Sequence, residues 1–143
     1  MNILLVNDDG ISAPGLQALY DAVKDLGKIF VVAPDGERSA ISHGITLDKP
    51  IPVRKYRNGT YEGVAVKGTP ADCVKLALSE LLGAKPDLVI SGINLGCNTG
   101  LNVIYSGTVG AAAEAVFHGI PGIAVSLTTY SGSELGTRSP FYT

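Results

Sequence analysis

Four short apolar segments constrain most strongly what this 143-residue chain can fold into. Each is rich in Val, Ile and Leu, and none alternates apolar with polar residues; they are residues 3–6, 29–33, 88–91 and 122–127. A strand with one face in water alternates apolar and polar side chains, whereas a parallel strand covered on both faces stays apolar along its length. We therefore expect four buried parallel strands.

Helical patterns lie between these segments. Apolar residues recur at i, i+3, i+4 and i+7 in three places, which begin at Leu16, Val74 and Val109, and a glycine follows each pattern. Because strands and helices alternate along the chain, the sequence predicts an α/β fold in which helices flank a mostly parallel sheet. The length fits one domain with its own core, so we expect residues 1–143 to form a single domain.

Residues 51–66 depart from this alternation. Asn58-Gly59 stands between two β-prone runs, which is a strong local signal for a β-hairpin. We expect an antiparallel excursion at the edge of the parallel sheet.

Charge and composition exclude several kinds of partner. The net charge is −2 at pH 7 and the pI is near 5.6, so no basic face for a nucleic-acid polymer or an anionic membrane is predicted. The first residues lack the basic start and cleavage site of a signal peptide, and no apolar run is long enough to span a bilayer. We expect a cytoplasmic protein in which Cys73 and Cys97 are reduced thiols.

Polar residues collect after three of the expected strands. Asp8 and Asp9 follow the first of these strands, Ser39 lies in the loop after the second strand, and Asn94 follows the third. Ligands bind outside the carboxyl ends of parallel strands, and two adjacent carboxylates repel each other unless a cation or proton lies between them. Mg2+ and Mn2+ prefer such oxygen ligands, so Asp8 and Asp9 predict a divalent metal site. From spacing alone, Ser39 and Asn94 are either turn residues or additional ligands.

The glycine-rich stretch 92–110 leads into the third helical pattern through Ser106-Gly107-Thr108. A helix start presents unpaired backbone N–H groups and the positive end of the helix dipole, which suits a phosphate. Gly107 allows close approach, while Ser106 and Thr108 offer hydroxyl donors; an ordinary N-cap is the alternative. His43, in the loop after Ser39, is either a general acid or, as is usual for a lone loop histidine, simply solvated.

Five segments resemble successive signature segments of one known family. They read MNILLVNDDGISAPG, VVAPDGERSAISHGIT, GTPADCVKLAL, SGINLGCNTG and YSGTVGAAAEA. The family they resemble is the SurE family, survival-protein nucleotidases that use a metal ion to remove the 5′- or 3′-phosphate from nucleoside monophosphates. The likeness runs from residue 1 to about residue 126, in the family's order. It implies a Rossmann-like fold and one divalent ion, Mg2+ or Mn2+, with Ca2+ as another ion that the site would bind.

The resemblance also implies roles for individual residues. The positions that match the family's metal ligands are Asp8, Asp9, Ser39 and Asn94, and of these Asp8, Asp9 and Asn94 are the catalytic positions. The positions around the phosphate are Asn98, Ser106, Gly107 and Thr108. Family members are usually longer and assemble as dimers or tetramers, so we expect a truncated SurE-like domain and a homodimer or homotetramer.

These observations together predict metal-assisted hydrolysis of a phosphomonoester. Three alternatives compete with it. A receiver-like signalling domain needs a phospho-accepting Asp at the end of a later strand, where Ser91-Gly92 stands. A nicotinamide-binding oxidoreductase needs Gly-x-Gly-x-x-Gly after the first strand, where the chain has Asn-Asp-Asp-Gly. The third alternative is a fragment of a nucleotidase that binds metal without turnover.

Overall fold

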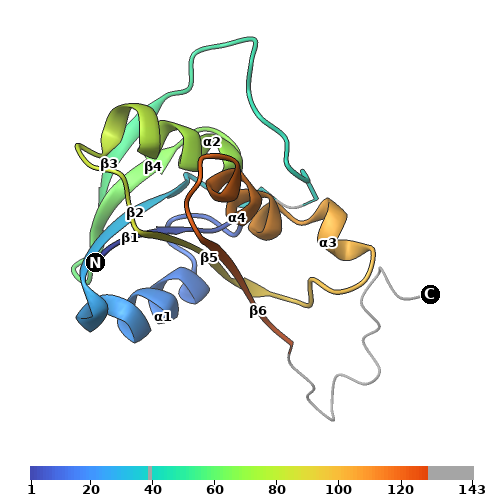
Figure 1. The fold of residues 1–143 in the computed structure, drawn as a ribbon, viewed down its shortest axis with the longest axis horizontal. Helices are drawn as coiled ribbons and strands as arrows, with labels where there is room; N and C mark the ends of the chain where they lie inside the picture. The colour runs from blue at the N-terminus through green and yellow to red at the C-terminus, as the bar shows by residue number, and fades with distance from the viewer. Residues whose placement is uncertain (39, 129–143) are drawn as a thin grey trace.

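A computed structural model describes residues 1–38 and 40–128 of the chain. Its strands form one six-stranded sheet in the order β3-β4-β2-β1-β5-β6, with helices on both faces (Figure 1). The strands are β1 (Asn2–Val6), β2 (Lys28–Pro34), β3 (Val53–Arg57), β4 (Glu62–Val66), β5 (Leu88–Leu95) and β6 (Gly122–Leu127). Within the described residues, no helix is both long and apolar enough to cross a membrane.

The four apolar segments form the parallel strands β1, β2, β5 and β6, as expected. The expectation that all four are buried is wrong for β6, which is an edge strand of the sheet and has exposed apolar side chains, Ile123 and Leu127 among them. Ile3 of β1 is in register with Ile29 of β2 on one side and with Leu88 of β5 on the other. The strand β5 is longer than the apolar segment 88–91 that predicted it. β5 continues to Leu95 through an irregularity between Ser91 and Asn94 in its pairing with β6.

The expected hairpin is present at the sheet edge. β3 and β4 pair antiparallel, and β4 pairs parallel with β2, so β3 is the edge strand. The turn contains Gly59 at φ +88, and Asn58 Oδ1 accepts backbone N–H groups from Thr60 and Tyr61, both at 3.0 Å. This turn chemistry is what Asn-Gly supplies between two strands.

The helices pack in two layers. α1 (Pro14–Val23), which ends in the 3-10 turn η1 (Lys24–Leu26), covers one face of the sheet. α2 (Pro70–Leu76), its π-helical continuation η2 (Ala77–Leu81) and α4 (Gly107–Phe117) cover the other; α3 (Asn102–Tyr105) is a single turn before α4 (Figure 1). α2 begins with a capping box between Thr69 and Asp72.

Successive residues of β1 serve two different cores. Ile3 and Leu5 pack with the α1 layer, whereas Leu4 and Val6 pack with the layer of α2 and α4, and all four are fully buried. Side chains alternate between the two faces of a strand, so a strand covered on both faces must be apolar throughout. This double burial fixes the position of the turn that follows Val6.

Candidate metal and phosphate site

The turn after β1 presents two adjacent carboxylates and is closed by the residues on either side of them. The buried Asn7 side chain donates from Nδ2 to the Gly10 carbonyl (2.9 Å) and accepts at Oδ1 from the Gly10 N–H (3.2 Å). Gly10 has φ +104, and a Cβ there would lie 3.0 Å from the Gly36 carbonyl carbon. Asn7 and Gly10 therefore fix the turn that carries Asp8 and Asp9.

Asp8 lies against the N-terminus of α4. The Thr108 hydroxyl donates to Asp8 Oδ1 over 2.5 Å, and both residues are buried. A Cβ added to Gly107 would lie 3.0 Å from Asp8 Cβ and 3.3 Å from Asp8 Oδ2. The fold thus brings together the carboxylate pair and the helix start, although Asp8 and Thr108 are 100 residues apart in the sequence.

Asp9 lies beside the end of β5. Its Oδ2 accepts the Leu95 backbone N–H at 3.4 Å, next to Asn94 in the chain. The Asn94 Nδ2 donates to the Gly96 carbonyl at 2.9 Å. This hydrogen bond orients the amide and leaves its Oδ1 as an acceptor for another group. Three of the predicted ligand positions therefore belong to two strand ends that meet at one edge of the sheet.

The environment of the two carboxylates disfavours their negative charge. Burial raises the pKa of Asp8 above its ordinary value, although the hydrogen bond from Thr108 opposes the change. Burial and the adjacent charge of Asp8 raise the pKa of Asp9. The charge of Glu37 adds to the effect at both residues. A divalent cation between the acids would relieve this repulsion.

The candidate ligands suit a hard cation that takes only a few of its ligands from the protein. Two carboxylates and an amide oxygen are the ligand types of Mg2+ and Mn2+, and Mg2+ keeps several waters. Within the described part of the chain, no group of three or more His, Cys, Asp or Glu side chains could hold a metal ion. Zinc is held mainly by Cys and His side chains, so the oxygen donors of Asp8, Asp9 and Asn94 fit Mg2+ or Mn2+ better than zinc.

The start of α4 uses its hydroxyls structurally. Ser106 is the N-cap, and its Oγ accepts the Val109 N–H at 3.2 Å, as the N-cap alternative expects. Thr108 gives its hydroxyl proton to Asp8. The backbone N–H groups of Gly107 and Thr108 lie in the first turn, where helices provide no internal acceptor. The Thr108 N–H faces the Asp8 carboxylate, because it is one of the groups that counteract the rise in the pKa of Asp8. These two N–H groups are the backbone donors at this helix start beside the carboxylates.

The comparison with known proteins decides the family. A sequence model of the family described as "Survival protein SurE" matches residues 3–142. The chain belongs to the SurE family. The "5'-nucleotidase SurE" of Desulforudis audaxviator is 54% identical over 144 residues, which cover 99% of this chain and 56% of the relative. The protein of the same name from Heliobacterium modesticaldum is 59% identical over 130 residues, 90% of this chain and 48% of the relative.

A solved structure gives the same assignment. The crystal structure of a SurE protein from Aquifex aeolicus is similar with a TM-score of 0.79 and 47% sequence identity. The match covers 88% of this chain and 50% of that one. The chain thus spans about half the length of the SurE relatives that it matches.

Ser39 and Asn98 are two further site positions that the SurE resemblance implies. Ser39 lies outside the described residues, but Arg38 before it donates its backbone N–H to the Asp8 carbonyl at 2.7 Å. Asn98 lies in the loop after β5, and its Nδ2 donates to Ser126 Oγ on β6 at 2.8 Å. Among the described contacts, none joins Asn98 to α4, so its place near the phosphate stays a prediction.

The interpretation of His43 as a solvated loop histidine is wrong. His43 Nε2 lies 2.5 Å from Glu114 Oε2 on α4, and its ring stacks on Phe117 with centroids 5.3 Å apart. His118 at the end of α4 contacts the other oxygen of Glu114 at 3.0 Å. Sequence reasoning missed Glu114. The available signal was that it is the single charged residue in the segment Gly107–Phe117.

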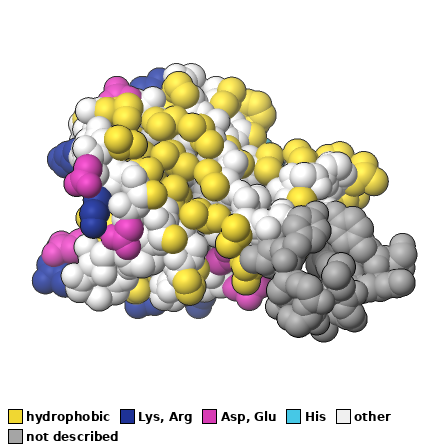
Figure 2. Space-filling view, turned by 90° about the horizontal axis from the view of Figure 1, so that it is seen from below, with side chains coloured by type: hydrophobic (Ala, Val, Ile, Leu, Met, Phe, Trp, Pro, Cys, Tyr) yellow, Lys and Arg dark blue, Asp and Glu magenta, His cyan; other side chains and the backbone are white. Residues whose placement is uncertain are grey.

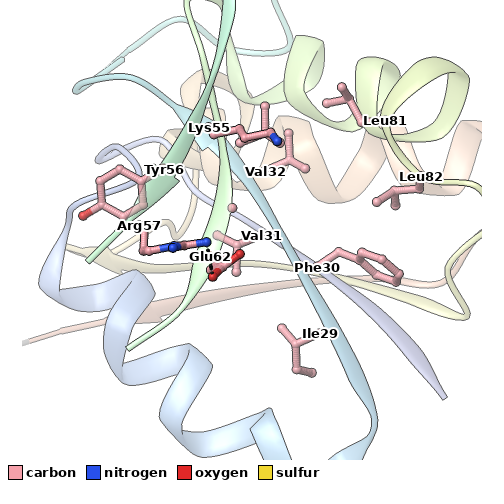
Figure 3. Close-up of a pocket in the computed structure, with 12 residues that line it drawn as sticks. Ile29, Phe30, Val31, Val32, Lys55, Tyr56, Arg57, Glu62, Leu81 and Leu82 are labelled. Atoms are coloured by element: carbon pink, nitrogen blue, oxygen red, sulfur yellow. Dashed lines mark ion pairs between the residues drawn. The ribbon is translucent and has the colours of Figure 1, made fainter. Parts of the chain in front are cut away.

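A groove of about 450 Å³ lies elsewhere, on the sheet face formed by β2, β3 and β4. Figure 3 shows apolar side chains lining it, with Phe30 from β2 and Leu81 from η2 among them. Arg57 and Glu62 form an ion pair of 2.6 Å beside it, and both side chains are largely exposed. None of its lining residues belongs to the carboxylate site, so this groove is separate from the predicted chemistry.

Proposed function

We propose that the protein hydrolyses phosphomonoesters, with nucleoside 5′- or 3′-monophosphates as its substrates and one divalent metal ion as its cofactor. The observation that carries the proposal is the contact of the buried Asp8 carboxylate with Thr108 at the start of α4. This contact puts candidate metal ligands next to candidate phosphate-binding groups. Membership of a family whose curated relatives are named 5'-nucleotidase SurE supports the same reaction.

Asp8, Asp9 and Asn94, with Ser39, would hold the metal ion. A bound divalent ion polarises a phosphate oxygen and lowers the pKa of a coordinated water. Thr108 orients Asp8 by binding Oδ1, which leaves Oδ2 as the ligand oxygen. Hydrogen bonds of this kind hold a ligand in position and keep it ionised.

The start of α4 would bind the substrate phosphate. The N–H groups of Gly107 and Thr108 would donate to phosphate oxygens, and the positive end of the helix dipole stabilises the negative charge there. Such donors act most strongly where charge develops in the transition state. Ser106 would add its hydroxyl proton, because its Oγ is engaged as an acceptor only. Asn98 would bind the phosphate from the loop after β5.

We propose a cytoplasmic location and a homodimer or homotetramer for the assembled protein. Figure 2 shows hydrophobic side chains gathered across one face of the molecule. Large apolar residues that are exposed in this chain include Ile104 of α3, Phe117 of α4 and Ile123 of β6. Extensive exposed apolar surface is typical of protein that is covered in an assembly.

A metal-binding form without turnover is the second candidate. It is favoured by one observation, that the Thr108 hydroxyl donates to Asp8 and is therefore not offered to a phosphate. The receiver-like alternative lacks the acceptor it requires, because β5, from Leu88 to its end at Leu95, contains no carboxylate.

Phosphate release from a panel of nucleoside 5′- and 3′-monophosphates tests the proposal. The panel is assayed with Mg2+, with Mn2+ and with a chelator, for this chain and for Asp8→Asn. We expect metal-dependent release by the chain and a loss of at least about 100-fold in the variant, because one ligand and its charge are removed. Asp21→Asn is the control, since Asp21 is an exposed residue of α1. Turnover that is unchanged in Asp8→Asn would contradict the assignment, and metal binding without turnover would favour the second candidate.

A further inference from the structure

Glu114 is a buried carboxylate that faces partners from three parts of the chain. It lies in the middle of α4 and is 7% exposed. Its Oε2 contacts His43 Nε2 at 2.5 Å, and its Oε1 contacts His118 Nε2 at 3.0 Å and Lys75 Nζ at 3.7 Å. Burying a carboxylate costs free energy unless it is paired, so these contacts account for its place among small apolar residues.

One of these partners belongs to a segment that lies across α4. A Cβ on Gly110 would lie 2.8 Å from the Ser42 carbonyl oxygen and 3.1 Å from His43 Cα, so the segment touches the helix where it lacks a side chain. Further along, Thr46 is attached to Asp72 of α2 by its N–H (2.9 Å) and its hydroxyl (2.7 Å). Residues 42–46 are therefore held against both helices of this layer.

The same segment supports the start of α4 from outside. The Ser42 hydroxyl donates to the Ile104 carbonyl at 2.7 Å, and the Ser42 N–H donates to the Tyr105 carbonyl at 3.0 Å. These two carbonyls immediately precede Ser106. Ile104 and Tyr105 are themselves exposed, at 63% and 61%. The hydrogen bonds from Ser42 thus hold a turn that is little buried by other parts of the chain.

We propose that Glu114 is a positioning residue for the phosphate-binding turn. It holds His43, and the adjacent Ser42 holds the carbonyls of residues 104 and 105, which fixes the N–H groups of Gly107 and Thr108. This inference rests on the proposed function, because it assigns those N–H groups to the substrate phosphate. Glu114 itself touches neither substrate nor metal.

The two histidines give a matched pair of variants. The chain has two histidines, and both contact Glu114, but only His43 belongs to the segment that supports the turn. We expect His43→Ala and Glu114→Gln to weaken binding of inorganic phosphate, in the presence of Mn2+, by about tenfold, the scale of one hydrogen bond to a charged group. We expect His118→Ala to weaken phosphate binding by less than about twofold. Glu62→Gln, at an exposed ion pair, is the surface control.

A conservative variant separates the hydrogen bond from the packing of the ring. His43→Gln loses the stack on Phe117 but keeps a side-chain donor for Glu114, so we expect it to recover most of the affinity lost in His43→Ala. We expect KM for a nucleoside monophosphate to rise with His43→Ala more than kcat falls.

Backbone amide spectra test the coupling without any turnover. In 1H–15N spectra of the metal-free chain, His43→Ala should shift the amide signals of Gly107 and Thr108, whereas His118→Ala should leave them nearly unchanged. Equal shifts in the two variants, or phosphate binding by His43→Ala at the affinity of the unsubstituted chain, would overturn the positioning role. Failure of the proposed function would appear differently, as absence of metal-dependent turnover in the unsubstituted chain.

Discussion

Thr108 is the residue that links the two halves of the candidate site. Its hydroxyl is buried and donates to a carboxylate that comes from the other end of the described chain. A buried carboxylate with one oxygen fixed in this way has a restricted orientation, which lowers the cost of placing its second oxygen on a metal ion.

Replacing Thr108 by Val tests this link. The substitution keeps the shape of the side chain and removes the donor to Asp8. We expect the affinity for Mn2+, measured by titration calorimetry, to fall by about 10- to 100-fold, the range for a lost hydrogen bond to a metal ligand. Thr60→Val, in the exposed hairpin turn, is the matched control. An affinity of Thr108→Val equal to that of the unsubstituted chain would show that the hydroxyl does not orient the ligand.

Single residues of the site were predictable to different degrees. Asp8 and Asp9 are predicted as ligands from the sequence, because two like charges at the end of an apolar strand repel each other unless a cation or proton lies between them. The role of Thr108 could not, since its hydroxyl was expected to donate to phosphate and instead donates to Asp8. Glu114 and His43 form a pair that no local pattern indicates, because the partners lie 71 residues apart.

The helix α4 begins at the candidate site and also carries Glu114, whose contacts depend on pH. Burial on its own would raise the pKa of Glu114, but hydrogen bonds with His43 and His118 and the nearby charge of Lys75 outweigh it and lower the pKa below the ordinary 4.5. A carboxyl with a lowered pKa in the folded state stabilises the fold above its unfolded pKa. That stabilisation disappears as the pH falls through the folded value.

Urea unfolding as a function of pH measures this contribution. We expect Glu114→Gln to be less stable than the unsubstituted chain at neutral pH, and the difference to shrink as the pH falls below about 4.5. Glu62→Gln should show little difference at any pH, because its ion pair with Arg57 is exposed. A stability difference for Glu114→Gln that stays constant from neutral pH to pH 3 would contradict the role of its charge.

At the scale of elements, the length of the β5 strand could not be predicted from its apolar pattern. Its apolar residues predict a strand over 88–91, but pairing with β6 resumes at Asn94 after an irregularity and continues to Leu95. Gly92 and Asn94 break the apolar pattern, so a strand that carries polar residues to the sheet edge reads as a loop. By contrast, the ends of β6 were predicted correctly, because Pro121 and the apolar run define them.

For the whole molecule, alternation of strands and helices predicted the parallel sheet but not the order of its strands. The pairing of β4 with β2 and of β5 with β1 depends on contacts between distant segments. This order brings the ends of β1 and β5 side by side, and thereby Asp9 against Leu95, the residue that follows Asn94. The predicted function and the predicted ligand set rest on the family likeness, because spacing alone left both open.

Metal binding should stabilise the whole fold if the ligands come from distant segments. A ligand that binds only the folded state adds about 2.7 kcal/mol at a concentration of 100 times its Kd. We expect saturating Mn2+ to raise the Tm by roughly 5–10 °C for a chain of this size. In Asp8→Asn the shift should be lost, and in Asp21→Asn it should be retained. A shift of equal size in all three proteins would indicate binding outside the candidate site.

The most direct test of the central claim is a crystal structure of the chain with Mn2+ and inorganic phosphate, with anomalous data to locate the metal. We expect one strong peak bound by oxygens of Asp8, Asp9 and Asn94 at about 2.0–2.6 Å, the range for hard cations. Phosphate should lie between this ion and the N–H groups of Gly107 and Thr108. Carboxylates of Asp8 and Asp9 that point away from each other, with no anomalous peak between the strand ends, would contradict the account.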